Sequence, residues 1–346
     1  MKFTDCISRR RTELMGCAIL LIICFHSYAR LPGGLWRYVV RENGNIGVDF
    51  FALMSGFGCV FSLKKDRDIG RYYARRLKRL LPPYYVALAL CILVAGVPSV
   101  RTLAANLIPI GAWVGEGQTY WYVSASLLYY ILIPPMLYLL DNARWPKLMF
   151  LALLGCTALL IPFVTRGVGP ALAIMRLPAL AAGAALGAFH HADWKKRDWW
   201  TLAALVALVW LAGFVLMRHH KMLSRAPLNL MSGSQANRLQ KALRAPAIVT
   251  LMALALEGVE RTPLRFVNAP LRALGRRSLE LYLGHAIVRY VCMHWLGISG
   301  GRMLLVMLAA SYPLALGIAL GAKYLMRLVG RLPLLRRPED PSTHDR

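Results

Sequence analysis

The chain has 346 residues, of which 58% are hydrophobic and 17% are charged, and its mean hydropathy is +0.49. A soluble domain is usually about 45–50% apolar and about 25% charged, so this composition argues against a soluble protein and predicts a membrane protein. The formal net charge is +26, from 42 Lys and Arg against 16 Asp and Glu, but the basic residues lie in short segments between apolar stretches. That distribution is typical of a multi-pass membrane protein and argues against a nucleic-acid partner.

A membrane-spanning helix needs about 20 mostly apolar residues, and ten stretches of the chain approach this length. We therefore predict an all-α, polytopic integral membrane protein, a bundle of about ten transmembrane helices in the lipid bilayer. The predicted helices are 13–30, 46–63, 81–100, 119–140, 147–165, 168–189, 199–217, 244–259, 277–297 and 302–326. The segment 102–115 is apolar but short, and we expect it to lie at the membrane interface or to re-enter.

The distribution of Lys and Arg predicts the orientation of the chain. With the N-terminus inside, the predicted cytoplasmic segments hold more than twice as many Lys and Arg as the outer loops. We therefore expect both termini to be cytoplasmic, in the inner (plasma) membrane, with the first helix as an uncleaved anchor. The basic loop 218–244 is the exception, and an interfacial amphipathic helix is one interpretation of it. Residues 331–346 are expected to form a short polar cytoplasmic tail that is disordered.

The seven cysteines show neither a CxxC motif nor a Cys/His spacing typical of a metal site. Most of them lie inside apolar stretches, where a small apolar role is expected. We therefore predict neither a disulfide framework nor a metal ion.

Two ionisable residues are predicted in the outer half of the membrane, where such residues are costly and usually functional. His26 lies about 20 Å along the first helix from its cytoplasmic end. Asp49 begins the second helix at a similar depth, and five apolar residues follow it. A neutral histidine bonded to a neighbouring helix and a helix N-terminal acid are the structural alternatives. We expect Asp49 to contact His26 and to support it as a general base.

A strongly basic segment, KKDRDIGRYYARRLKRLLPPYY, follows the second helix. Arg76 and Arg79 are one helical turn apart and are predicted at the cytoplasmic end of the third helix, with Arg75 and Lys78 beside them. Paired arginines bind phosphates well, although an ordinary cytoplasmic anchor explains part of the charge.

Further candidate residues lie in the later helices. Trp121 and Tyr122 begin the fourth helix and suit stacking on a sugar ring, unless they belong to the interfacial aromatic belt. The remaining intramembrane ionisable residues are Arg176, Glu280, His285 and Arg289. We expect Arg176 to face a polar cavity, where it contacts the donor or an oxyanion, and Arg289 to belong to the same cavity. His285 is expected to contact the acceptor or to support the site, and Glu280, about 140° from it around the helix, is a further substrate-binding candidate.

Six short motifs occur in a fixed order: CAILLIICFH, GVDFFALMSGF, RRLKRLLPPYY, YWYVSASLLYYILIPPML, MRLPALAAGAALG and LGRRSLELYLGHAIV. In this order and at these separations they resemble the acyltransferase 3 family of membrane-bound acyltransferases. The resemblance runs from about residue 11 to 326, so residues 1–330 are expected to form one acyltransferase 3 membrane domain.

The resemblance implies the transfer of an acyl group, usually acetyl, from cytoplasmic acyl-CoA to a hydroxyl of a cell-surface or lipid-linked glycan. Acetyl-CoA or another acyl-CoA is then a donor substrate, and no permanently bound cofactor is expected. The resemblance makes His26 the catalytic candidate and ties Arg76 and Arg79 to acyl-CoA. The family often has an arginine where this chain has Met15, and Arg11, one turn further out, is the candidate substitute.

The mechanism and the class of function stay open at this level. His26 acts either as a general base or through a covalent acyl-histidine, and O-acylation is not distinguished from N-acylation of an amino sugar. A transporter of a polysaccharide or lipid-linked precursor is the main alternative, although the chain shows no inverted repeat. A sensor or structural membrane protein would leave the arginine pair, His26 and Asp49 without a shared purpose.

Overall fold

The computed structural model describes residues 2–116, 119–161, 168–223 and 233–331. All regular structure in these ranges is helical. The first half contains α1 (Phe3–Arg9), α2 (Arg11–His26), α3 (Gly34–Trp36), η1 (Arg37–Glu42), α4 (Ile46–Lys65), α5 (Ile69–Ala95), α6 (Val100–Leu107), α7 (Trp121–Asn142) and α8 (Pro146–Leu159). The second half contains α9 (Val168–Ile174), α10 (Leu177–His190), α11 (Lys196–Leu223), α12 (Gly233–Glu260), η2 (Pro263–Val267), α13 (Asn268–Arg276), α14 (Ser278–His294) and α15 (Gly300–Arg331).

The predicted all-α membrane bundle is confirmed, and each of the ten predicted stretches contains a helix. Among the described residues, seven helices are long and apolar enough to cross a membrane: α4, α5, α7, residues Pro170–His190, α11, α12 and α15. The other three, α2, α8 and α14, have 16, 14 and 17 residues. The predicted number of about ten spanning helices is therefore not confirmed.

Two predicted helices differ from the observed ones at positions near prolines. The third helix begins at Ile69, where the side chain of Asp68 caps it by accepting from the amide of Arg71, and Pro82 and Pro83 lie inside it. The predicted helix 168–189 is divided at Arg176, directly before α10, whose second residue is a proline. Proline suits this first turn, where no amide is needed for an intrahelical bond.

The segment 218–244, predicted as a basic loop, is largely helical where the structure describes it. Helix α11 continues to Leu223, and α12 begins at Gly233. Residues 224–232 lie outside the described residues, as does nearly all of the predicted tail 331–346. The basic residues 238, 241 and 244 therefore belong to the first turns of a long helix and not to a loop.

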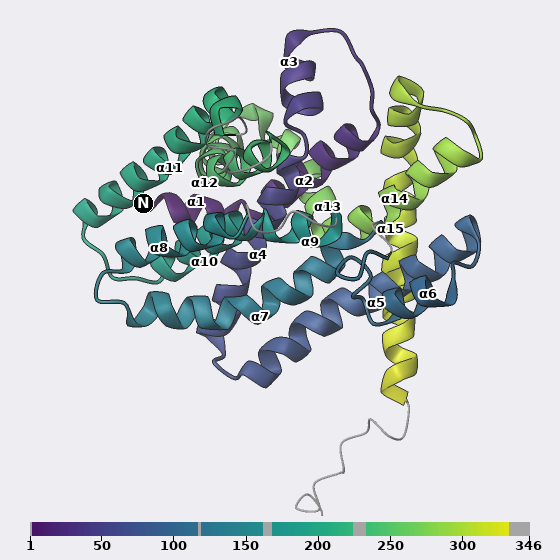
Figure 1. Ribbon diagram of the computed structural model, residues 1–346, viewed down its shortest axis with the longest axis horizontal. Coiled ribbons are helices and arrows are strands. Elements are labelled where there is room, and N and C mark those ends of the chain that lie inside the picture. The colour runs from purple at the N-terminus through teal and green to yellow at the C-terminus, as the bar shows by residue number, and fades with distance from the viewer. Residues whose placement is uncertain (1, 117–118, 162–167, 224–232, 332–346) are drawn as a thin grey trace, which may run out of the picture.

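Helix α4 occupies the centre of the bundle and packs against α2, α7, α10 and α12 (Figure 1). Helices α11 and α12 pack side by side at one end of the view. Helix α15 lies at the other end beside α14 and α5. This order brings α2, α4, α7, α12 and α14 together around the middle of the protein, where the candidate residues lie.

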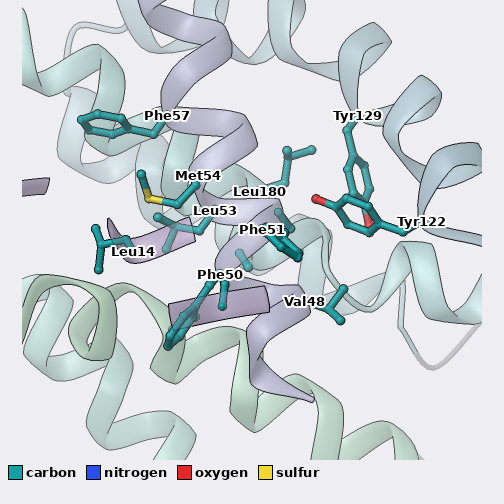
Figure 2. Close-up of a cluster of buried hydrophobic side chains, with 14 of the residues drawn as sticks. Leu14, Val48, Phe50, Phe51, Leu53, Met54, Phe57, Tyr122, Tyr129 and Leu180 are labelled. Carbon is teal, nitrogen blue, oxygen red and sulfur yellow. The ribbon is translucent and has the colours of Figure 1, made fainter. Parts of the chain in front are cut away.

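Aromatic and aliphatic side chains of α4 fill the core (Figure 2). Close helix packing depends on two glycines, because a side chain at Gly56 would collide with the carbonyl of Leu180, and one at Gly183 with the carbonyl of Leu53. Small residues let helix backbones approach in membranes, where burial of apolar side chains drives little association.

We expect Gly183→Ala to lower the free energy of unfolding by about 1–3 kcal/mol, because the added methyl group overpacks the α4–α10 contact. Thermal unfolding of the detergent-purified protein measures the change. Gly155→Ala in α8 is the matched control, since nothing lies within 4 Å of its added carbon, and it should be neutral or stabilising. Equal stability of the two variants would contradict the backbone contact.

Candidate active site

His26, the last residue of α2, is paired with a second histidine. Its Nδ1 lies 3.2 Å from Nε2 of His285 on α14, and Nδ1 of His285 lies 3.2 Å from the carbonyl oxygen of Leu281. A carbonyl only accepts, so a neutral His285 donates there and keeps an unprotonated Nε2. His26 then donates to it through Nδ1, and Nε2 of a neutral His26 carries the free lone pair. This tautomer, assigned from the partners, is the one that a general base requires.

The predicted contact of Asp49 with His26 is wrong, because the carboxylate faces Arg176 instead. Asp49 Oδ1 lies 3.9 Å from Arg176 Nε, and both side chains are almost fully buried. Arg176 also donates through Nη1 to the carbonyl of Leu172 at 3.3 Å, and its guanidinium carbon lies 5.4 Å from the centre of the Trp121 ring. Asp49 and His26 share a similar depth along their helices, but their helices are rotated toward different neighbours.

Five of the candidate residues border one cavity of about 400 Å³, which we call the histidine cavity. Its walls come from α2, α4, α5, α7, α12, α14 and the break between α9 and α10. The candidate residues that line it are His26, Trp121, Arg176, His285 and Arg289. Arg176 and Arg289, expected to share a cavity, do so, and the structure adds His26, Trp121 and His285 to the same lining.

A second, smaller cavity of about 80 Å³ gathers the predicted arginines, and we call it the arginine cavity. Arg11, Arg76 and Arg79 line it together with Met15. Arg76 donates through Nη2 to the carbonyl of Gly58 at 3.2 Å, and the guanidinium of Arg11 covers the same glycine, where a side chain would displace it. No carboxylate lines this cavity among the described residues, so its positive charge is available to an anion.

Tyr282 on α14 lines both cavities. Ser278, one turn before it, lines only the arginine cavity, and His285, almost one turn after it, lines only the histidine cavity. At a rise of 1.5 Å per residue, these two positions are about 10 Å apart along the helix. The hydroxyl of Tyr282 accepts from the amide of Tyr122 at 3.4 Å, which holds the ring between the two cavities.

Trp121 and Tyr122 are separated by the helix that carries them. Successive residues of an α-helix point about 100° apart, and Trp121 lines the histidine cavity whereas Tyr122 lines the arginine cavity. Tyr122 is buried, with its hydroxyl 3.5 Å from Oγ of Ser55. The two rings therefore border different cavities, and one sugar ring cannot stack on both of them.

Three other predicted residues line neither cavity. Arg75 donates to Asp66 at 2.7 Å, and the hydrogen bonds from Arg71 and Arg75 hold the pKa of this half-buried carboxyl well below its usual value. Lys78 is exposed on α5. Glu280 pairs with Arg277 at 3.8 Å and, two residues before Tyr282, lies on another face of α14. These residues add charge near the helix ends and do not border the cavities.

Several residues of the histidine cavity were not predicted from the sequence, above all Arg238 and Asn45. Lys241, 2% exposed, lies behind them and donates through Nζ to Asn45 Oδ1 and to the carbonyl of Glu42, both at 2.7 Å. A signal was present in the sequence, because the segment 218–244 carries six basic residues on the predicted outer side, against the usual distribution. Of these six, Arg238 lines the cavity and Lys241 lies behind it.

The fold and the site together define a multi-pass helical membrane protein with polar cavities at its centre. The chain belongs to the acyltransferase 3 family, because the sequence profile of that family's acyltransferase domain matches residues 14–326. This confirms the resemblance over nearly the whole chain and makes the protein a membrane acyltransferase. Neither a search of curated proteins nor a search of solved structures finds a match.

We expect a double-mutant cycle to couple Asp49 to Arg176 and not to His26. Asp49→Asn combined with Arg176→Gln should show an interaction energy of about 0.5–3 kcal/mol in thermal unfolding, because the two buried charges compensate each other. Asp49→Asn combined with His26→Gln should be additive within about 0.5 kcal/mol. The reverse result would restore the pairing expected from sequence.

Proposed function

We propose that the protein transfers an acyl group, most simply acetyl, from cytoplasmic acyl-CoA to a hydroxyl group of a cell-surface or lipid-linked glycan. The observation that carries this proposal is the lining of both cavities by Tyr282. It places the cluster of arginines and the histidine with a free lone pair on two sides of one aromatic ring, in adjacent cavities. On α2, Met15 lines the arginine cavity and Ile22 lines the histidine cavity. These two positions are about 10 Å apart along the helix, the same separation as that of Ser278 and His285 on α14.

The donor enters at the arginine cavity in this proposal. A volume of about 80 Å³ admits a narrow chain but not a nucleotide, so the nucleotide of acyl-CoA stays outside and its thin pantetheine arm enters. Arg11, Arg76 and Arg79 bind the phosphates at the entrance by charge-assisted hydrogen bonds. Arg76, one turn nearer the start of α5, is the closer of the two to the proposed cytoplasmic end, and Arg79 lies about 4.5 Å further along the helix. The arm then passes Tyr282 to bring the thioester to His26.

The chemistry in this proposal is a transfer from thioester to ester. The acceptor hydroxyl loses its proton to Nε2 of His26 as its oxygen bonds to the thioester carbonyl carbon. The carbon–sulfur bond then breaks, and the proton passes from His26 to the sulfur of the departing CoA thiol. His285 stabilises the imidazolium of His26 by accepting from its Nδ1 throughout. A positioned base of this kind contributes about 10²–10⁴-fold to a rate.

The acceptor occupies the histidine cavity, which is five times larger than the arginine cavity and has Trp121 as a flat surface for a sugar ring. The proposal places this cavity toward the outside of the inner (plasma) membrane, with both chain termini cytoplasmic. Arg9, Arg10 and Arg272, at the same end of the bundle as the arginine cavity, support this orientation by the positive-inside rule. The lipid bilayer, acyl-CoA and the glycan are its proposed partners.

His26→Ala should remove an acetyl group from the glycans of the host cell. Mass spectrometry of surface and lipid-linked glycans compares cells with the wild-type protein, cells with the gene deleted, and the deletion carrying a well-expressed His26→Ala variant. A mass difference of one acetyl group should disappear in the deletion and return only with the wild type. His285→Gln, which keeps a hydrogen-bonding side chain but cannot act as an imidazole, should give a reduced level.

A deletion that changes the amount of glycan, but no acyl group on it, would overturn the proposal. That result would favour a transporter of a polysaccharide or lipid-linked precursor, whose activity needs no acyl donor. Full acetylation by His26→Ala would reject His26 both as a base and as an acyl carrier.

Arg76→Gln should raise the KM for acetyl-CoA about tenfold or more, because one charge-assisted hydrogen bond to phosphate is lost. Steady-state transfer by the purified protein in nanodiscs measures it. Acetyl-pantetheine, which lacks the nucleotide and its phosphates, should show no such change. Arg71→Gln is the matched control on the same helix, since Arg71 is exposed and bound to Asp66. Equal effects on both donors would contradict phosphate binding by Arg76.

A further inference from the structure

We propose that the acceptor is anionic and that the histidine cavity binds its phosphate or carboxylate group between Arg176, Arg238 and Arg289. This inference rests on the proposed acyl transfer and names the chemical class of its acceptor. The three arginines come from three separate parts of the chain: the start of α10, the second turn of α12 and the last third of α14. All three line one cavity with His26.

The charges around this cavity do not balance. Among the described residues, its lining contains these three arginines and no carboxylate. Asp49, 3.9 Å from Arg176, lies behind the lining and offsets one positive charge. Lys241 adds another positive charge behind Asn45. An excess of positive charge inside a membrane bundle is costly, and an anionic ligand compensates it.

The arginines also keep hydrogen-bonding capacity for a ligand. Arg176 is 3% exposed, and its Nε has no hydrogen-bond partner in the structure, since 3.9 Å to Asp49 is too long for a hydrogen bond. Nε of Arg289 is buried without a partner as well, while its Nη2 donates to the hydroxyl of Tyr28 at 3.0 Å. An unsatisfied buried guanidinium N–H is costly, so an acceptor atom of the ligand is expected to meet it.

A neutral sugar fits this lining poorly. Its hydroxyl groups both donate and accept, and a neutral-sugar site therefore needs accepting side chains such as Asp or Glu. Arginine only donates, and its planar fork matches phosphate and carboxylate oxygens. The aromatic ring of Trp121 beside Arg176 still provides a surface for the sugar ring that carries the anionic group.

The anion would lie close to the reacting atoms. Arg289 follows His285 by one turn of α14, about 6 Å along the helix. An anionic group held there orients a hydroxyl of the same sugar toward Nε2 of His26. Two sources share this chemistry: the phosphate that links a sugar to its lipid carrier, and the carboxylate of an acidic sugar. The experiment distinguishes them.

The test uses radiolabelled acetyl-CoA, the full-length protein in nanodiscs and the total glycan and glycolipid extract of the host cells as the acceptor mixture. The products are separated by anion exchange into neutral and anionic fractions. The label should enter the anionic fraction. If the anion is phosphate, mild acid should release the label from its lipid, because mild acid cleaves a sugar from a lipid phosphate. If the anion is the carboxylate of an acidic sugar, chemical reduction of the carboxyl groups should abolish retention of the label on the anion-exchange column.

Label in the neutral fraction would overturn the anionic acceptor and leave the proposed acyl transfer standing. Label in neither fraction, with wild-type protein shown to be folded, would overturn the proposed transfer itself. The two failures are therefore distinct.

Arg238→Gln provides the second measurement. With the anionic fraction as acceptor, this variant should raise the acceptor KM about tenfold or more and leave the KM for acetyl-CoA unchanged, because a charged hydrogen bond to the acceptor is lost. Arg238→Lys, which keeps the charge, should restore part of the affinity. Arg302→Gln is the matched control, an exposed arginine at the start of α15. An unchanged acceptor KM in Arg238→Gln would contradict the proposal.

Discussion

The parallel contact between α4 and α10 is the constraint on which the centre of the protein depends. Gly183 lies against the backbone of Leu53, and Gly56 lies against that of Leu180, so the two backbones touch. Helices this close have a fixed register, because a shift along the axis would bring a side chain into the contact. The same register, continued toward the first turns of both helices, places Asp49 beside Arg176. A packing contact made by residues without side chains thus determines where two buried charges meet.

Buried charge then determines the shape of the cavities. Arg176 lies where α9 ends and α10 begins, and a helix break exposes backbone groups that need partners in a membrane. The break finds its partners within the protein, because the carbonyls of Leu172 and Ala173 accept from Nη1 of Arg176 and from the hydroxyl of Tyr129. It also borders a polar cavity, where the side chain of Arg176 lies near Asp49 and the ring of Trp121. Charged residues that are costly in a bilayer are tolerated here because they face one another and a common cavity.

The sequence predicted depth along each helix better than rotation about it. His26, Arg176 and His285 could be placed in the membrane from helix length alone, and the arginine pair from its spacing of one turn. Which neighbour a side chain faces depends on packing between distant segments, and for that reason Asp49 was assigned to His26 although it faces Arg176. The same limit explains Tyr122, which follows Trp121 in sequence but points into the other cavity. Arg238 was missed because its segment was interpreted as a loop, although the helix α12 begins five residues before it.

Helix α14 connects the two cavities, because it lines both of them. Its successive turns contribute Ser278 to the arginine cavity, Tyr282 to both cavities, and His285 and Arg289 to the histidine cavity. A helix fixes these side chains at known heights, so the separation between the arginine cavity and the histidine pair is set by the helical rise. Tyr282 is held between the two cavities by the amide of Tyr122, at the first turn of α7. Among the described residues, this ring is the one side chain that borders both cavities, so the boundary between them depends on it.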